Sequence, residues 1–300
     1  MSSTWREQKE RGTPFALNLI LWIAQNLGRG FATLFLYPIT AYFYFFAHEQ
    51  RKASQSYLRR VLGHDPTGRE IARHIFTFSA TILDRIFLLS DRHDIFNVQI
   101  NNEEILHKLQ EKHQGCLLLG SHLGSFEVMR TVGVKRFPVK VMMHRDHNEN
   151  ITKLLESLNP DIVESIIPLG QADTMLKVKE ALDNASLVGL LGDRVAENDK
   201  PVLVDFLGDE AAFPAGPFQL AASLKVPIVM FFGIYRGGNQ YEITFEPLDI
   251  QLLPVEITDE KDITWWVKQY VSCLEKYTRD APYNWFNFYE FWPEKQTTNK

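Results

Sequence analysis

The chain has 300 residues, a formal net charge of −5 and 45% hydrophobic residues. This length is enough for one large globular domain or two small ones, and the acidic balance argues against nucleic-acid binding by the whole molecule. Its two cysteines, Cys116 and Cys273, are too few for a disulfide framework or a zinc pattern. Cys116 lies in an apolar run, where we expect a small buried side chain.

The N-terminal region is apolar over residues 15–47, where Arg29 is the one side chain expected to be charged. The apolar runs on either side of Arg29 fall short of the roughly 20 residues that a spanning helix needs. No small-residue cleavage site follows, as a signal peptide requires. We expect residues 1–50 to form a membrane-associated helical segment, as a span, a re-entrant hairpin or an interfacial helix. The alternative is a buried helical hairpin of a soluble protein.

Basic side chains follow this segment within residues 51–73, and the whole stretch 48–92 has a helical pattern. If the segment spans once, these charges place the downstream domain, residues 51–295, in the cytoplasm. They are also consistent with contact to anionic headgroups or with an ordinary solvated helix face. Thr67, followed by Glu70, predicts the start of a helix.

Beyond this point, short apolar runs alternate with amphipathic segments, which predicts an α/β fold with a mixed, largely parallel central sheet flanked by helices. The expected strands are Gly115–Gly120, Val139–His144, Val163–Pro168, Leu187–Leu191, Pro227–Tyr235 and Tyr241–Pro247. The expected helices are Phe126–Lys135, Glu149–Leu158, Ala172–Asp183, Pro217–Leu224 and Asp259–Thr278.

The stretch Leu-Gly-Ser-His-Leu-Gly-Ser-Phe-Glu, residues 119–127, places His122 five positions before Glu127. Such positions lie about 140° apart on a helix, so the two side chains meet only if His122 sits in the turn before the helix. Gly124 and Ser125 permit that geometry. The histidine is then a proton acceptor whose tautomer the carboxylate fixes. Nine histidines in the chain make chance pairings of this kind common.

Three polar residues, His122, Arg145 and Asp193, each come just past the end of an expected strand. Ligands bind at the carboxyl ends of parallel strands, so we expect the three to share one site. Taken alone, Arg145 also fits a surface ion pair, and Asp193 an ordinary turn. A covalent serine mechanism has no Gly-x-Ser-x-Gly elbow to support it, and a zinc site has no His-Glu-x-x-His spacing.

The His122–Glu127 stretch resembles the His-x4-Asp/Glu motif of lysophospholipid-type acyltransferases, in particular the Glu version of the late acyltransferases of lipid A biosynthesis. The resemblance extends in order over roughly residues 15–295. Further segments that resemble the family are Met143–Asn148, Leu187–Asp193, Phe206–Gly208, Phe213–Pro217 and Asn284–Trp285.

The chain departs from the family pattern at two places. It has Arg194 after Asp193, where the family often has glutamine or histidine, and its closing run Tyr283–Trp292 is unusually aromatic. The aromatic run fits either core packing or a belt at a membrane interface. Both departures bear on the acceptor and leave the reaction type unchanged.

The resemblance implies an O-acyltransferase of the bacterial inner membrane, with its catalytic domain on the cytoplasmic side. It would move a fatty acyl chain from acyl carrier protein or acyl-CoA to a hydroxyl of a lipid or glycolipid, such as a lipid A precursor. The alternatives are a lipid or thioester hydrolase and a non-catalytic, membrane-tethered lipid-binding protein.

In this reading His122 is the general base and Glu127 orients it. Arg145 binds a phosphate or carboxylate of the acceptor, or the carrier's phosphopantetheine, and Asp193 holds Arg145 or the acceptor. Backbone N–H groups at Gly124 and Ser125 stabilise the oxyanion. An apolar groove receives the acyl chain, and no metal or cofactor is required.

Overall fold

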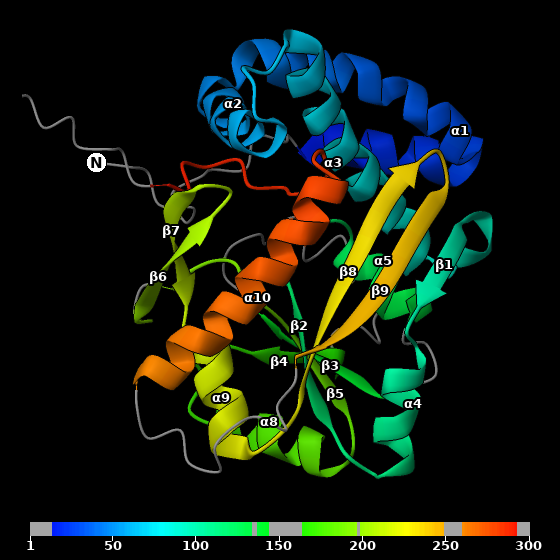
Figure 1. Ribbon diagram of the computed structural model, residues 1–300. Coiled ribbons are helices and arrows are strands. Elements are labelled where there is room, and N and C mark those ends of the chain that lie inside the picture. The colour runs from blue at the N-terminus through cyan, green and yellow to red at the C-terminus, as the bar shows by residue number, and fades with distance from the viewer. Residues whose placement is uncertain (1–13, 134–136, 144–163, 197–198, 249–259, 293–300) are drawn as a thin grey trace, which may run out of the picture.

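The apolar runs of the chain become the strands of a central sheet, and the amphipathic segments become helices on its two faces (Figure 1). The computed structural model describes residues 14–133, 137–143, 164–196, 199–248 and 260–292. The strands are β1 (Asn97–Asn101), β2 (Cys116–Gly120), β3 (Val139–Met143), β4 (Ile166–Pro168), β5 (Leu187–Leu191), β6 (Pro201–Phe206), β7 (Asp209–Pro214), β8 (Ile228–Gly237) and β9 (Gln240–Leu248). The helices are α1 (Pro14–Phe46), α2 (His48–Leu62), α3 (Gly68–Leu89), η2 (His93–Ile95), α4 (Glu104–Glu111), α5 (Phe126–Val128), η3 (Met129–Gly133), α8 (Thr174–Asp183), α9 (Gly216–Leu224) and α10 (Glu260–Asp280).

The main sheet has the strand order β1-β9-β8-β2-β5-β3-β4. All neighbouring pairs in it are parallel except β8 and β9, which form an antiparallel hairpin. Strands β6 and β7 form a separate antiparallel pair. The fold class predicted from the sequence is therefore confirmed.

Side chains of the central strands alternate between two hydrophobic cores, one on each face of the sheet. On one face Leu117 and Leu119 of β2 pack with residues of α2, α8, α9 and α10. On the other face Cys116 and Leu118 pack with residues of α1, α3 and α4. Cys116 is fully buried, as its apolar setting predicts. Figure 1 shows α10 crossing one face, with α1 to α3 gathered at one end of the sheet.

Helix α1 contains the two predicted apolar runs, joined at Gly28, whose backbone leaves the helical conformation at φ 81°. The neighbouring Arg29 turns inward, and its Nε donates to Asp84 Oδ1 of α3 at 2.6 Å. The hydroxyl of Tyr241 in β9 donates to the same carboxylate at 2.8 Å, so the buried charge of α3 has partners from two other elements. None of the described helices is by itself long and apolar enough to cross a membrane. The pair Ile20–Phe46 and His48–Leu62, bent by 94°, passes that test of length and composition only when taken together.

The structure forms all six predicted strands, within a few residues of their expected ends. It also forms the predicted helix start, where Thr67 and Glu70 make reciprocal hydrogen bonds. Strands β1, β6 and β7 were not predicted, because β1 is a polar edge strand and the other two pair outside the main sheet. The predicted helix from Phe126 is short, since after Val128 it continues as a π-helical turn to Gly133. The predicted helix Glu149–Leu158 lies outside the described residues.

Candidate active site

Two neighbouring parallel strands carry the centre of the site. Gly120 at the end of β2 pairs with Leu191 at the end of β5, and His122 and Asp193 lie two residues beyond these paired positions. Both loops therefore leave the same edge of the sheet side by side. The sequence prediction that residues following strand ends converge is confirmed for His122 and Asp193.

The Asp193 carboxylate binds His122 through both of its oxygens. His122 Nδ1 lies 2.7 Å from Asp193 Oδ1, and the His122 backbone N–H donates to Oδ2 at 2.8 Å. The indole Nε1 of Trp285 donates to the same Oδ2 at 3.0 Å. Asp193 is only 1% exposed, whereas the His122 side chain is 26% exposed. With Nδ1 engaged by the carboxylate, Nε2 is the ring nitrogen left to exchange a proton with a substrate.

The charges around this pair favour a neutral imidazole next to an ionised carboxylate. Burial lowers the pKa of His122, and the nearby charge of Arg194 lowers it further, while Asp193 opposes both effects. Burial alone would raise the pKa of Asp193, but the charge and hydrogen bonds of His122, together with Arg194, lower it to about 2. At about pH 7, His122 is thus a base with a free lone pair on Nε2, provided that Nδ1 carries the proton.

Glu127 has partners other than the predicted one. Its Oε2 accepts from Arg85 Nε of α3 at 3.0 Å, and its Oε1 accepts from Arg130 Nε at 2.6 Å. The carboxylate that engages His122 Nδ1 is Asp193, which corrects the expectation that Glu127 does so. The physical reason is that the two guanidinium groups occupy both oxygens of the buried Glu127 carboxylate. Glu127 instead ties α3 to the helix that starts after residues 121–125, the turn that carries His122.

The backbone N–H groups of Gly124 and Ser125 are also engaged. Gly124 donates to the carbonyl of Asn284 at 2.8 Å, and Ser125 donates to the carbonyl of Gly233 at 2.7 Å. These bonds hold the turn against two distant segments, so neither N–H group is available to an oxyanion as expected. The Ser125 hydroxyl accepts from the backbone N–H of Val128 at 3.3 Å and caps the short helix.

Arg145 lies outside the described residues, so its predicted place in the site stays a prediction. Sequence reasoning missed the roles of Arg85 and Arg130. The i,i+3 spacing of Glu127 and Arg130 could have signalled their ion pair, whereas no local pattern signals Arg85. It noted Trp285 only as part of a closing motif and Arg194 only as a departure from the family pattern. The closing aromatic run belongs to the core, since Trp285, Phe286 and Trp292 are buried.

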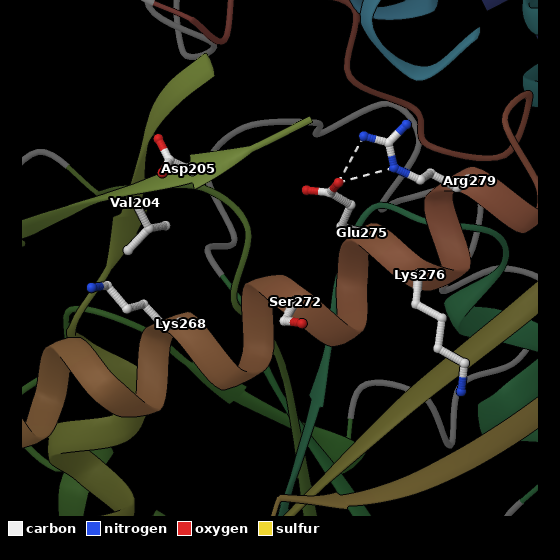
Figure 2. A pocket seen from close by; sticks show the side chains of 7 residues that line it. All are labelled: Val204, Asp205, Lys268, Ser272, Glu275, Lys276 and Arg279. Atoms are coloured by element: carbon white, nitrogen blue, oxygen red, sulfur yellow. Dashed lines mark hydrogen bonds and ion pairs between the residues drawn. The ribbon is translucent and has the colours of Figure 1, made fainter. Parts of the chain in front are cut away.

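A groove lies between β6 and α10 (Figure 2). It is lined by Val204, Asp205, Lys268, Ser272, Glu275, Lys276 and Arg279. Most of these side chains are charged or polar, and Arg279 forms an ion pair with Glu275 at 2.7 Å. The groove contains none of the predicted site residues, and Val204 is the single apolar residue among those that line it, so it does not match the groove expected for an acyl chain.

Fold and site together define an α/β protein with a histidine–carboxylate pair at the carboxyl ends of two adjacent parallel strands. A family model described as bacterial lipid A biosynthesis acyltransferase matches residues 3–293. Because the match covers nearly the whole chain, the protein belongs to this family, and the resemblance seen in the sequence is confirmed. The family assigns the chain to the acyltransferases of lipid A biosynthesis. No curated protein matches the chain.

Proposed function

We propose that the protein is a membrane-associated O-acyltransferase in which His122 is the general base. It moves a fatty acyl chain from an acyl thioester, on acyl carrier protein or coenzyme A, to a hydroxyl of a lipid or glycolipid such as a lipid A precursor. The observation that carries the proposal is the hydrogen bond of 2.7 Å between His122 Nδ1 and the buried Asp193 carboxylate. That bond fixes the tautomer a general base needs.

In the proposed reaction, His122 Nε2 accepts the proton of the acceptor hydroxyl as its oxygen attacks the thioester carbonyl. Asp193 keeps the Nδ1 proton in place and stabilises the imidazolium that forms. The tetrahedral intermediate then expels the thiolate, which takes the proton from His122 Nε2. One ester bond forms, one thioester bond breaks, and the histidine returns to its neutral state.

Glu127 takes part in this proposal through its arginines. One buried carboxylate holds two guanidinium groups, so the Glu127–Arg85–Arg130 cluster has one excess positive charge. Arg85 is one-third exposed and presents part of its guanidinium to solvent. Phosphate groups on the acceptor or on the donor's pantetheine arm match the geometry and charge of such arginines. We assign Arg145 the same kind of role.

The proposed membrane contact is made by α1, within residues 1–50, while residues 51–295 carry the transfer reaction. One side of α1 is buried against α3, and the other side exposes an apolar surface, which we call the α1 outer face. The α1 outer face consists of Trp22, Leu27, Phe31, Leu34, Phe35, Tyr37, Tyr42, Phe45 and Phe46. An apolar surface of this kind is typical of a helix that lies in a membrane interface.

Helix α3 connects α1 to the site. The ring of Tyr37 in α1 lies 5.1 Å from that of Phe76 in α3. Phe78 of α3 is exposed, and its ring lies 5.3 Å from that of Phe286, which bonds the turn that carries His122 (residues 121–125, the catalytic turn of this proposal). In the proposal, a bilayer contacts both the α1 outer face and Phe78, which brings a lipid acceptor towards His122. The proposed location is the cytoplasmic face of the bacterial inner membrane, where the basic residues that follow the apolar segment can contact anionic headgroups.

The test is acyl transfer by purified full-length protein, from a labelled acyl thioester to a lipid A-type glycolipid carried in phospholipid vesicles. Acyl carrier protein and coenzyme A thioesters are compared as donors. Label that appears in the glycolipid only when the acceptor is present supports the proposal. Label released as free fatty acid at a rate that the acceptor does not change would contradict it, and would favour a hydrolase.

A further inference from the structure

The closing segment Asn284–Phe286 lies along the catalytic turn and forms part of its backbone structure. The N–H of Gly124 donates to the carbonyl of Asn284 at 2.8 Å, and the N–H of Phe286 donates to the carbonyl of His122 at 2.8 Å. Between these two bonds, Leu123 and Trp285 form an antiparallel bridge. The segment that holds the turn therefore comes from the end of the chain, more than 150 residues away.

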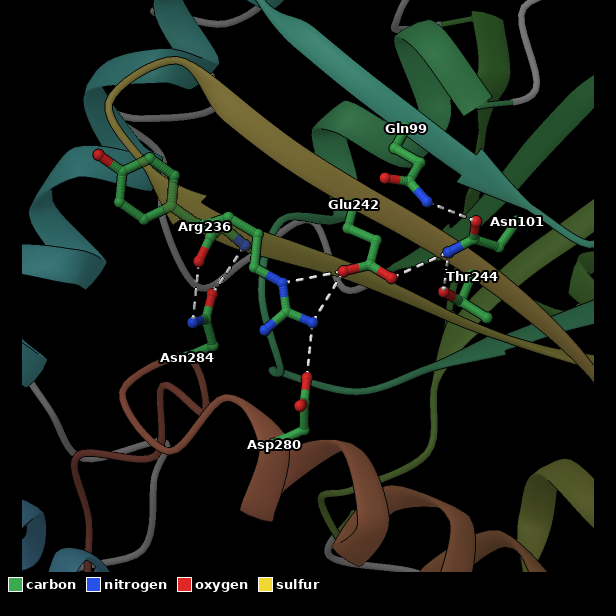
Figure 3. A network of polar contacts seen from close by, with 8 residues as sticks. Gln99, Asn101, Arg236, Glu242, Thr244, Asp280 and Asn284 are labelled. Carbon is green, nitrogen blue, oxygen red and sulfur yellow. Dashed lines mark hydrogen bonds and ion pairs between the residues drawn. The ribbon is translucent and has the colours of Figure 1, made fainter.

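Side chains on both sides fix this segment. The carbonyl of Trp285 lies 2.9 Å from His74 Nε2 of α3, and His74 Nδ1 lies 2.8 Å from the hydroxyl of Ser54 in α2. The Asn284 side-chain oxygen accepts from the Tyr235 backbone N–H of β8 at 2.9 Å, and the Asn284 NH2 group donates to the Tyr235 carbonyl at 3.2 Å (Figure 3). Asn284 and Trp285 are thus held by two helices and by a strand of the main sheet.

The Trp285 indole is fully buried, and its position is set by aromatic packing. Its ring lies 5.0 Å from that of Tyr57, 5.2 Å from Phe206 and 4.9 Å from Phe291, in edge-on contacts. Nε1 points at Asp193 Oδ2 from this rigid setting. A donor that cannot move away keeps the carboxylate from rotating, and Oδ1 therefore stays directed at His122 Nδ1.

We infer that Trp285 is a positioning residue, which aligns the Asp193 carboxylate with His122 and completes the site from the C-terminal end of the chain. The inference rests on the proposed function of His122 as the base. It assigns the closing segment a role in the reaction as well as in the core. When the indole N–H is removed, the His122 backbone N–H still holds Asp193 Oδ2 at 2.8 Å, so the carboxylate is less well aligned but stays beside Nδ1. It then carries more negative charge, which favours a protonated His122.

The other ionisable groups around His122 and Asp193 do not change charge in the pH range in which the pKa of His122 is compared. Arg194 follows Asp193 directly and stays charged. Tyr270 of α10 and Tyr289 of the closing run also face Asp193, and burial raises the pKa of both phenols above the usual value. Both tyrosines are therefore neutral across the range in which His122 titrates.

The experiment compares Trp285→Phe with Trp292→Phe. Trp292 is a matched control, because it is buried in the same aromatic cluster and its Nε1 donates to the carbonyl of Phe206 at 3.3 Å, away from the pair. The pKa of His122 is measured by NMR on histidine-labelled full-length protein, with the resonance assigned by His122→Gln. Trp285→Phe should raise the pKa of His122 by about 0.5 to 1 unit and lower kcat about tenfold with little change in KM. Trp292→Phe should do neither.

A second variant at position 285 keeps the test valid if Trp285→Phe does not fold. Placing β-(3-benzothienyl)alanine at position 285 keeps the bicyclic shape and exchanges only the N–H group for sulfur. It should reproduce the pKa rise of Trp285→Phe. Equal His122 pKa values in wild type, the 285 variants and the 292 control would overturn the inference. The NMR measurement does not depend on turnover. If Trp285→Phe raises the pKa of His122 but the wild-type protein transfers no acyl group, the proposed function is refuted and the positioning of Asp193 by Trp285 is not.

Discussion

Replacing Asp193 by asparagine tests which carboxylate directs His122. The carboxylate accepts three hydrogen bonds, from the His122 backbone and Trp285 at Oδ2 and from His122 Nδ1 at Oδ1. An asparagine amide has one oxygen and one NH2 group. If the oxygen replaces Oδ2, the NH2 group faces Nδ1, which must then lose its proton. The proton moves to Nε2, and the base is lost.

The opposite amide orientation keeps the productive tautomer but directs the NH2 group at two N–H donors. Each donor left without an acceptor costs about 1–3 kcal/mol, so this orientation lies about 2–6 kcal/mol higher. A difference of only 2 kcal/mol leaves about one molecule in 30 with a functional base. The loss of the charge that stabilises the imidazolium lowers the rate further. We expect Asp193→Asn to reduce kcat about 1,000-fold, with KM changed less than about threefold.

The assay is acyl transfer over a range of pH, with donor and acceptor each varied up to saturation so that kcat and KM are both obtained, and Glu127→Gln is the matched carboxylate variant. Loss of the Asp193 charge should move the acidic limb of the rate profile to lower pH, because that charge raises the pKa of His122. Glu127→Gln should leave this limb in place and act mainly on KM for anionic substrates. A shift of the limb in Glu127→Gln, with near-normal kcat in Asp193→Asn, would refute this account of the pair.

Two further predictions concern the residues that support the site. Gly124 has φ +78°, and a methyl group there would overlap the carbonyl of Gly233. Gly124→Ala should therefore lower the free energy of unfolding by more than about 3 kcal/mol. The control Gly170→Ala should lower it by about 1 kcal/mol, because Gly170 has a similar φ of +85° but open space around it. Equal losses of unfolding free energy in Gly124→Ala and Gly170→Ala, measured by chemical denaturation, would contradict the close approach of Gly124 to the Gly233 carbonyl. Burial lowers the pKa of His74 to about 4 in the folded protein. In the unfolded chain the same histidine takes up a proton as the pH falls below about 6.5, which favours unfolding. Between about pH 7 and pH 5, wild type should therefore lose about 2 kcal/mol more stability than His74→Gln. Parallel stability curves for the two proteins would contradict this.

The sequence predicted the parts of the fold that depend on local pattern. The apolar runs that became β2 and β5 were visible, and with them the convergence of His122 and Asp193 at adjacent strand ends. The capping pair Thr67 and Glu70 was visible for the same reason. Strand β1 could not be predicted in this way. Its apolar and polar residues alternate only weakly, and its partner strand β9 is distant in the sequence.

Apart from the i,i+3 pair of Glu127 and Arg130, the partners of the predicted site residues followed from tertiary contacts that no spacing reveals. Glu127 seemed free for His122 because Arg85, which binds it, is 42 positions earlier on another helix. The N–H groups of Gly124 and Ser125 seemed free because their acceptors belong to distant segments. The role of Trp285 needed the fold as well, since it contacts Asp193 across 92 positions.

The central claim is that His122 is the base of acyl transfer, and the most direct test is the transfer rate of His122→Ala under saturating conditions. The variant is first shown to be folded by its unfolding transition. The account predicts that label transfer to the glycolipid acceptor falls at least about 100-fold, the scale of general base catalysis. Transfer at the wild-type rate by a folded His122→Ala protein would contradict it.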